Sequence, residues 1–279
     1  MGSEKPNILL TGSMGLIGKA LKDHFRDIGY NANIIGVDLL GDNVVDIRDL
    51  EGMNKLFEEH KFDSIIHLAA LKDINESFVK PDAYYDTNVL GTDTIVHLAE
   101  IHKVPQLIFG SSGSVDFSNN VYTDTKVLGE SIVSNRAYGS GINLRLESVL
   151  QTYGDTYIAN STSLIDNLLR TLHGDKERFE LYGNTMRSFV TLGAVCDKIV
   201  SLLQNPVSSS VVTFSEERIN ISTLEVVTAF RKIVGDIPYT VLPQRTWESS
   251  LMVESQNIKL MYAALSEIRD MHYKPITPL

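Results

Sequence analysis

The chain has 279 residues, of which 43% are hydrophobic and 22% are charged, a composition typical of a globular protein. Its formal net charge of −10 disfavours general binding to nucleic acid, because an acidic surface repels a phosphate backbone. Cys196 is the only cysteine, which excludes an intrachain disulfide and a cysteine-ligated metal site. Residues 1–6 are too short and polar for a signal peptide, and no apolar run approaches the ~20 residues of a membrane span, so we expect a cytoplasmic protein without membrane contact.

The first 150 residues alternate short apolar runs with helical patterns. We expect strands at residues 7–10, 33–38, 64–68, 106–109 and 142–146, and helices at residues 16–29, 49–60, 82–102 and 122–136. Unbroken apolar strands separated by helices are typical of a parallel sheet that is covered on both faces. With right-handed crossovers, this pattern predicts an α/β fold with a doubly wound parallel sheet of the Rossmann type.

After Leu150 the alternation becomes irregular. Two further helices and a strand that returns to the main sheet are expected at residues 161–173, 193–203 and 211–214. The chain is therefore predicted to form two domains. The first is an NAD-binding domain of residues 1–150 and 188–215, and the second is a smaller C-terminal substrate-binding lobe of residues 151–187 and 216–279.

A glycine-rich turn follows the first expected strand. Gly12, Gly15 and Gly18 form the pattern G-x-x-G-x-x-G, with Leu16 and Ile17 between the last two glycines. Glycine suits a turn with positive φ and lets the backbone approach a pyrophosphate, which the N-terminus of the following helix attracts. The glycines alone would also fit a plain strand-to-helix loop. The strand before them and the helix after them favour a dinucleotide site.

Asp38 stands at the end of the second expected strand, twenty positions after Gly18. Its carboxylate can accept hydrogen bonds from the ribose hydroxyls of adenosine and would repel a 2′-phosphate. No arginine stands beside Asp38, so NAD is favoured over NADP as the cofactor. Asp46 and Ile47 follow the next short segment and are candidates to lie against the adenine.

Tyr122 and Lys126 form a Y-x-x-x-K pattern at the start of an expected helix. Residues four apart share one helical face, so the lysine ammonium is expected to favour the tyrosinate and to lower the tyrosine pKa. Such a tyrosine can act as a general base. Ser112 ends the fourth strand, at the edge where doubly wound sheets bind ligands, and its hydroxyl can hydrogen-bond the reacting oxygen. Tyr122 and Lys126 alone would also fit an ordinary pair on the surface of a helix, but their place after the fourth strand favours a catalytic role.

Together these motifs resemble the extended short-chain dehydrogenase/reductases, and among them the NAD-dependent epimerase/dehydratase family. The resemblance covers about residues 7–205. It includes the third-strand motif His67-Leu68-Ala69-Ala70 and the segment 84–92 around Asn88. The segment 71–81 is most similar to UDP-galactose 4-epimerases.

The resemblance implies a role for each set of site residues. The implied catalytic residues are Ser112, Tyr122 and Lys126. Besides the glycine turn and Asp38, the implied cofactor-binding residues are Leu68, Ala69, Ala70, Lys72, Asn88, Tyr122 and Lys126. The implied substrate-binding residues are Ser112, Ser148, Arg187 and Arg245. A guanidinium suits the diphosphate of a nucleotide, and an ordinary surface charge is the alternative for either arginine.

The implied activity is that of an NAD-dependent nucleotide-sugar 4-epimerase, an isomerase of the UDP-glucose/UDP-galactose type with a transient 4-keto sugar. Gly113 and Ser114 stand where the 4,6-dehydratases of the family carry an Asp-Glu pair, which disfavours dehydration. The alternatives are a nucleotide-sugar reductase or dehydrogenase, and a non-catalytic dinucleotide-binding protein. The resemblance also implies a homodimer through helices 82–102 and 122–136. No metal is expected, because the histidines show no ligand spacing.

The chain departs from the family pattern on the substrate side. Only nine residues separate Ser112 from Tyr122, and Val121 replaces the usual proline. Ser148 replaces an asparagine, and Gly193 stands where an aspartate is common. These changes leave the hydride chemistry intact and bear on which sugar is bound.

Overall fold

The computed structural model describes residues 5–41, 43–116, 119–150, 164–208, 210–214, 218–244 and 258–272. The chain separates into two compact units. The first unit contains Met1–Leu146 and Val195–Thr213, and the second contains Glu147–Ala194 and Phe214–Leu279. Within the described ranges, no helix is long and apolar enough to cross a membrane.

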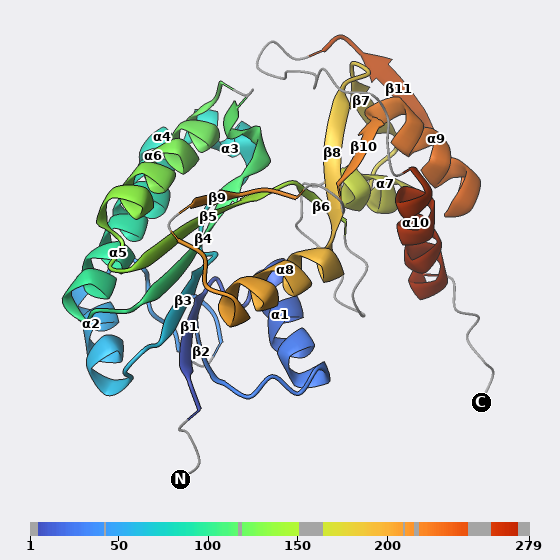
Figure 1. Ribbon diagram of the computed structural model, residues 1–279. Coiled ribbons are helices and arrows are strands. Elements are labelled where there is room, and N and C mark those ends of the chain that lie inside the picture. Colours follow the sequence, from blue (N-terminus) through green and yellow to red (C-terminus); the bar gives the residue numbers. More distant parts are fainter. Residues whose placement is uncertain are drawn as a thin grey trace. The chain divides into compact units, whose positions relative to one another are not determined.

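A six-stranded parallel sheet forms the centre of the first unit (Figure 1). Its order is β2-β1-β3-β4-β5-β9, and the order reverses between β1 and β3. This is a doubly wound arrangement, which confirms the fold class predicted from the sequence. The returning strand β9 pairs with β5, as expected. The strands are β1 (Asn7–Thr11), β2 (Asn33–Val37), β3 (Ser64–His67), β4 (Gln106–Ser112), β5 (Ser140–Leu146) and β9 (Ser210–Val212).

Helices cover both faces of this sheet. Figure 1 shows α2, α5 and α6 on one face and α1 and α8 on the other. Buried apolar side chains, among them Leu9, Ile65, Val96 and Phe109, fill the layer under α2, α5 and α6. The helices are α1 (Leu16–Asp27), α2 (Leu50–Glu59), α3 (Ile74–Val79), α4 (Pro81–Tyr84), α5 (Gly91–Ile101), α6 (Val121–Arg136) and α8 (Leu192–Gln204).

The segment expected as one helix over residues 82–102 is continuous but irregular. The helix α4 leads into a π-helical turn, η1 (Tyr85–Leu90), which leads into α5. A π turn widens the helix by one residue and is frequent at functional sites. Here it carries the buried side chain of Asn88.

The second unit has its own core and two small sheets, of order β10-β8-β6 and β11-β7. Because β6 pairs with β8, residues 147–150 and 188–194 belong to this unit, whereas the sequence analysis assigned them to the first domain. The elements are β6 (Ser148–Leu150), α7 (Leu164–Leu172), β7 (Phe179–Tyr182), β8 (Met186–Thr191), β10 (Ile219–Ser222), α9 (Thr223–Ile233), β11 (Tyr239–Leu242) and α10 (Ile258–His272).

Gly129 is the point where α6 packs directly on β4. A Cβ added there would lie 2.5 Å from Cζ of Phe109. We expect Gly129→Ala to lower the free energy of unfolding by about 1–3 kcal/mol, because the tightly packed ring must move. The control is Gly193→Ala in α8, where no described atom lies within 4 Å of the added Cβ. That variant, in the first turn of α8, should be at least as stable as the wild type. Urea unfolding measures both changes, and a Gly129→Ala variant as stable as the wild type would contradict this packing.

Candidate active site

The three glycines of the turn between β1 and α1 have different surroundings. Gly12 has a φ of +73°, and a Cβ there would lie 2.7 Å from the backbone nitrogen of Ala69. A Cβ at Gly18 would lie 2.3 Å from the carbonyl oxygen of Gly12. These two glycines therefore allow close packing of the turn against the loop after β3 and against α1. Gly15, in contrast, is exposed.

Gly15 is the N-cap of α1, and in the described structure no side chain caps this end. The first turn, which includes the half-buried Leu16 and Ile17, contains no acidic residue. The first N–H groups of a helix have no partner within the helix, and the helix dipole favours an anion at this end. The turn can therefore offer backbone donors to an anion such as a pyrophosphate.

Asp38 lies directly after β2 and beside this turn. Its carboxylate accepts hydrogen bonds from the backbone N–H groups of Met14 (3.0 Å) and Leu39 (2.8 Å). These bonds fix the carboxylate where a ribose acceptor is expected. Asp46, in contrast, pairs with Arg48 at 2.6 Å between Oδ2 and Nη2, and the hydrogen bonds from Arg48 hold the Asp46 pKa below its usual value. The side chain of Ile47 is buried in the core under α2 and α5.

A chain of hydrogen bonds anchors the loop after β3. The Ala69 N–H donates to Thr11 Oγ1 at 3.2 Å, and this hydroxyl lies 2.7 Å from His67 Nδ1. On the other side of the ring, His67 Nε2 lies 3.0 Å from Thr92 Oγ1, which donates to the Asn88 carbonyl at 2.7 Å. Because the Thr92 proton goes to that carbonyl, His67 carries its proton on Nε2 and accepts from Thr11 at Nδ1. His67 is thus a buried, neutral part of the structure.

The side chain of Asn88 holds the same loop against α6. Its Oδ1 accepts from the Leu71 N–H at 2.8 Å, and its Nδ2 donates to the Leu71 carbonyl at 2.9 Å and to Thr125 Oγ1 at 3.0 Å. These bonds occupy both ends of the amide, so Asn88 acts through the position of the loop. Residues 68–70 are half-buried in that loop, and Lys72 is exposed at its end.

The expected catalytic residues meet where α6 crosses the carboxyl end of β4. The Asn120 side chain caps α6 with a hydrogen bond of 2.9 Å, which places Tyr122 in the first turn. Ser112 ends β4 beside the side chain of Tyr122, close enough for its hydroxyl to lower the Tyr122 pKa. One turn later, Lys126 Nζ donates to the Gly110 carbonyl at 2.7 Å. We call the contact between residues 110–112 of β4 and residues 122–130 of α6 the β4–α6 seam.

The protonation of the seam differs from what the sequence predicted. Burial raises the pKa of Tyr122, and the hydrogen bond from Ser112 offsets this in part. The expectation that Lys126 lowers the Tyr122 pKa is therefore wrong for this structure, in which the ammonium is directed to the Gly110 carbonyl. Burial lowers the pKa of Lys126 itself to about 8. Burial thus disfavours both the Tyr122 phenolate and the Lys126 ammonium. A positive charge placed near Tyr122 would act against this and favour the phenolate.

Ser114 is a member of the site that the sequence analysis did not predict. It lies in the short helix η2 (Gly113–Asp116), which folds back over the end of β4. Ser114 Oγ lies 2.8 Å from Ser112 Oγ and 3.4 Å from Thr123 Oγ1, and the Ser114 N–H donates to Ser112 Oγ at 3.2 Å. The Ser112 hydroxyl is thus held by both the N–H and the hydroxyl of Ser114. The turn that brings these hydroxyls together has no periodic signal in the sequence.

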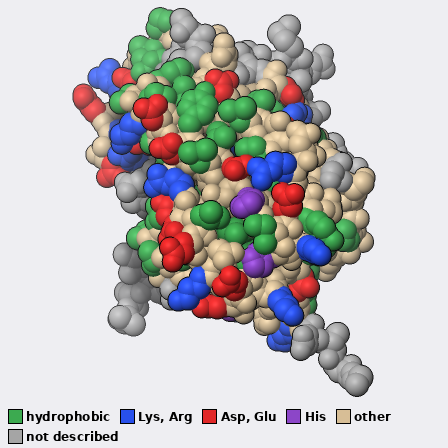
Figure 2. Space-filling view, turned by 90° about the vertical axis from the view of Figure 1, so that its left-hand side faces the viewer, with side chains coloured by type: hydrophobic (Ala, Val, Ile, Leu, Met, Phe, Trp, Pro, Cys, Tyr) green, Lys and Arg blue, Asp and Glu red, His purple; other side chains and the backbone are tan. Residues whose placement is uncertain are grey.

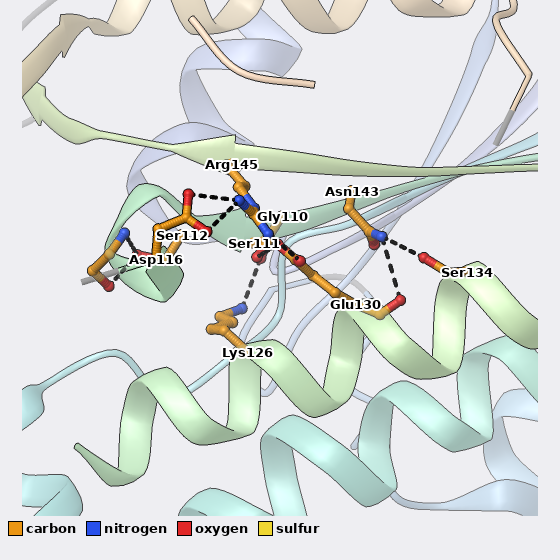
Figure 3. Close-up of polar contacts among 10 residues, drawn as sticks. Gly110, Ser111, Ser112, Asp116, Lys126, Glu130, Ser134, Asn143 and Arg145 are labelled. Atoms are coloured by element: carbon orange, nitrogen blue, oxygen red, sulfur yellow. Dashed lines mark hydrogen bonds and ion pairs between the residues drawn. The ribbon is translucent and has the colours of Figure 1, made fainter. Parts of the chain in front are cut away.

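A cluster of charged side chains lies behind the seam (Figure 3). Arg145 pairs with Glu130 through two bonds of 2.8 Å, from Nε to Oε1 and from Nη2 to Oε2. Its Nη1 reaches Asp116 at 2.9 and 2.8 Å. Ser111 Oγ also donates to Glu130 Oε1, at 2.5 Å. No local sequence pattern indicates this cluster, because its members come from four separate elements.

The residues expected to bind the rest of the substrate lie in the second unit. Ser148 is exposed in β6, and Arg187 is half-buried in β8, opposite Ile221 of β10. Arg245 lies outside the described residues. In the part of the chain that the structure describes, no group of three His, Cys, Asp or Glu side chains could hold a metal ion.

Known proteins resemble this chain in sequence and in fold. The model of the NAD dependent epimerase/dehydratase family matches residues 8–221. The UDP-glucose 4-epimerase 4 of Oryza sativa subsp. japonica is 26% identical, over 89% of this chain and 82% of the relative. The crystal structure of UDP-glucose 4-epimerase from Bifidobacterium longum in complex with NAD+ and UDP has a TM-score of 0.82 at 20% identity, over 96% of this chain and 98% of that chain. MoeE5 in complex with UDP-glucuronic acid and NAD has a TM-score of 0.78 at 21% identity, over 95% and 98%.

The buried His67 makes stability depend on pH. Burial, with a smaller contribution from the Lys126 charge, lowers the His67 pKa from 6.5 to about 3. Between pH 6.5 and about pH 3, His67 therefore binds a proton in the unfolded chain but not in the folded chain. The contribution of neutral His67 to the free energy of unfolding is fully present above pH 6.5 and is lost as the pH falls toward 3. Between these values we expect a loss of about 1.4 kcal/mol per pH unit from this residue. Urea unfolding at pH 7 and pH 5 should show that the free energy of unfolding of the wild type falls by roughly 2 kcal/mol. His67→Gln, which cannot titrate in this range, is the control. An equal loss in that variant would refute the assignment.

Proposed function

The chain belongs to the NAD dependent epimerase/dehydratase family, and on this premise we propose that it is an NAD-dependent nucleotide-sugar 4-epimerase. The observation that carries the proposal is the position of Ser112, at the end of β4, beside Tyr122, one helical turn before the buried Lys126. The hydroxyl of Tyr122, close to the buried ammonium of Lys126, can act as a base that removes the proton of an alcohol and as an acid that returns it. Gly113 and Ser114 offer no carboxylate after Ser112, which supports epimerisation over dehydration.

The residues present fit NAD, the cofactor of the family. The glycine turn and the N-terminus of α1 suit the pyrophosphate, and the fixed carboxylate of Asp38 suits the adenosine ribose rather than its 2′-phosphate. Lys126 and the loop of residues 68–71 would hold the nicotinamide end. When bound, NAD supplies an acceptor and donor of hydride.

The residues of the seam handle the proton. Tyr122, as the phenolate, accepts the proton of the sugar 4-hydroxyl, while Ser112 hydrogen-bonds the same oxygen. Burial alone favours the phenol of Tyr122, so the positive charge of a bound nicotinamide would be needed to favour the phenolate. The transient 4-keto sugar then turns to present its other face, and Tyr122 returns the proton to the oxygen. Fixed positions for these groups contribute much of the rate, because the reacting atoms start at the right distance.

The second unit is proposed to bind the nucleotide sugar, as the first is proposed to bind NAD. Arg187 and Arg245 suit the diphosphate, because a guanidinium can donate two parallel hydrogen bonds. Ser148 is proposed to contact the sugar side. UDP-glucose and UDP-galactose are the first candidates, since the rice relative is a UDP-glucose 4-epimerase. The complex of MoeE5 with UDP-glucuronic acid supports testing a uronic acid as well.

We also propose that the chain forms a homodimer through α5 and α6. Figure 2 looks onto the side of the molecule where these helices lie and shows hydrophobic side chains gathered in its upper half. Large exposed apolar side chains on η1, α5 and α6 are Tyr85, Leu90, Ile101, Val127 and Leu128. A second copy would remove them from water. Light scattering should therefore give twice the mass of the chain, and a monomer at micromolar concentration would contradict the proposal.

The proposed activity is tested without added cofactor. The purified protein is incubated with UDP-glucose or UDP-N-acetylglucosamine, and NMR follows the products. We expect the galacto epimer without net NADH. Tyr122→Phe should lower turnover by at least about 100-fold and leave bound NAD in place, because it removes only the proton acceptor.

The matched control is Tyr138→Phe, which removes the hydroxyl of an exposed tyrosine outside the seam and should leave turnover unchanged. Substantial turnover by Tyr122→Phe would sink the assignment of the base. Steady formation of NADH by the wild type would instead indicate a nucleotide-sugar dehydrogenase.

A further inference from the structure

One guanidinium connects the elements that carry the reacting groups. Arg145 lies in β5 directly opposite Ser111 of β4. From there it reaches Glu130 on α6 and Asp116 at the end of η2, as Figure 3 shows. Because the guanidinium is planar and presents its donors in a fixed fork, these pairs set the distance and the angle between α6 and η2.

Both partners of Arg145 lead directly to the reacting groups. Glu130 lies one helical turn after Lys126, and that helical turn is rigid. Asp116 closes the short helix whose Ser114 holds Ser112. A displacement of Arg145 would therefore move the hydroxyl of Ser112 relative to α6, which carries Tyr122.

The two ion pairs differ in what they contribute to stability. The side chains of Arg145 and Glu130 are only 18% and 11% exposed, so removing either one would leave the other largely buried without its main charged partner. Asp116 is 65% exposed, and exposed pairs contribute little to stability. The pair with Asp116 can therefore be broken without unfolding the chain, and any effect on catalysis must come from geometry or from charge.

We propose that Arg145, held between Glu130 and Asp116, is a positioning residue that fixes η2 to α6 and thereby keeps the Ser112 hydroxyl against Tyr122. The proposal rests on the proposed function and adds to it a residue that does not touch the substrate. The exposed Asp116 is the part of this arrangement that can be removed cleanly.

The pKa of Tyr122 separates positioning from simple charge. The hydrogen bond from Ser112 lowers the Tyr122 pKa, so a loosened η2 should raise it. Loss of the Asp116 charge alone would act in the opposite direction, because a distant negative charge disfavours the phenolate. The other charged or titratable groups around the seam are Lys126 and Glu130 on α6, Arg145 on β5 and His67 on β3. The substitution leaves all of these in place.

The experiment compares Asp116→Asn with Asp116→Glu and with Asp124→Asn. Asp124 is an exposed carboxylate in the first turn of α6, so its substitution matches the charge change without touching Arg145. Three properties are measured: kcat and KM for the nucleotide sugar, the urea midpoint, and the Tyr122 pKa. The last comes from tyrosinate absorbance, as the difference between each variant and the same variant with Tyr122→Phe.

For Asp116→Asn we expect kcat to fall about 10-fold with KM changed by less than about 2-fold, since misplacement affects the transition state most. Its urea midpoint should stay that of the wild type, and its Tyr122 pKa should rise. Asp116→Glu should restore both kcat and the pKa, whereas Asp124→Asn, which removes a nearby negative charge and leaves the pairs of Arg145 intact, should lower the Tyr122 pKa.

A Tyr122 pKa that falls or stays constant in Asp116→Asn would overturn the positioning role, as would a kcat equal to that of Asp124→Asn. The two proposals fail separately. If the wild type turns over no nucleotide sugar but Asp116→Asn still raises the Tyr122 pKa, the proposed function fails and the positioning stands. If the wild type is active and Asp116→Asn is unchanged, only the positioning fails.

Discussion

The contact between α6 and the carboxyl end of β4 is the constraint on which the site depends. Gly129 lets the helix approach the ring of Phe109, and the Lys126 ammonium lies 4.8 Å from the centre of the same ring. Lys126 is also bound to the backbone of Gly110. The position of the helix is thus set by packing and by a hydrogen bond from the Lys126 side chain to the main chain of β4. Tyr122 and Ser112 meet because of that position, since each lies at a fixed offset along its own element.

Two hydrogen-bonded networks stabilise opposite sides of this contact. On the side of β1 and β3 the network is neutral and runs through His67, whose burial is offset by bonds at both ring nitrogens. On the side of β5 it is charged and runs through Arg145 and Glu130. The neutral network holds the loop that would contact the cofactor. The charged network holds η2, which carries the hydroxyl of Ser114. Buried polar groups of this kind are costly unless they are fully bonded, so each network favours one arrangement.

Features that depend on local sequence patterns could be predicted, and the family match confirms the resemblance that they carried. The alternation of expected strands and helices predicted the parallel sheet, and the spacing of Gly12, Gly15 and Gly18 predicted the turn beside Asp38. Features that depend on contacts between distant segments could not be predicted.

The pairing of β6 with β8 places the boundary between the units at other residues than the sequence indicated. The π turn around Asn88, the bonds of Ser114 and the ion pairs of Arg145 likewise arise only in the folded chain. The direction of the Tyr122 pKa was predicted wrongly because it depends on burial, which spacing does not reveal.

In the proposed reaction, the C4 hydrogen leaves and returns as hydride, while Tyr122 handles only the proton on oxygen. The most direct test is to run the reaction on UDP-glucose in deuterated water and to examine both sugars by NMR. We expect conversion to the galacto epimer with ordinary hydrogen retained at C4, because a hydride carried by the cofactor would not exchange with solvent. Deuterium at C4 would show that the carbon is deprotonated instead, and this would contradict the proposed hydride transfer, as would the absence of any epimer.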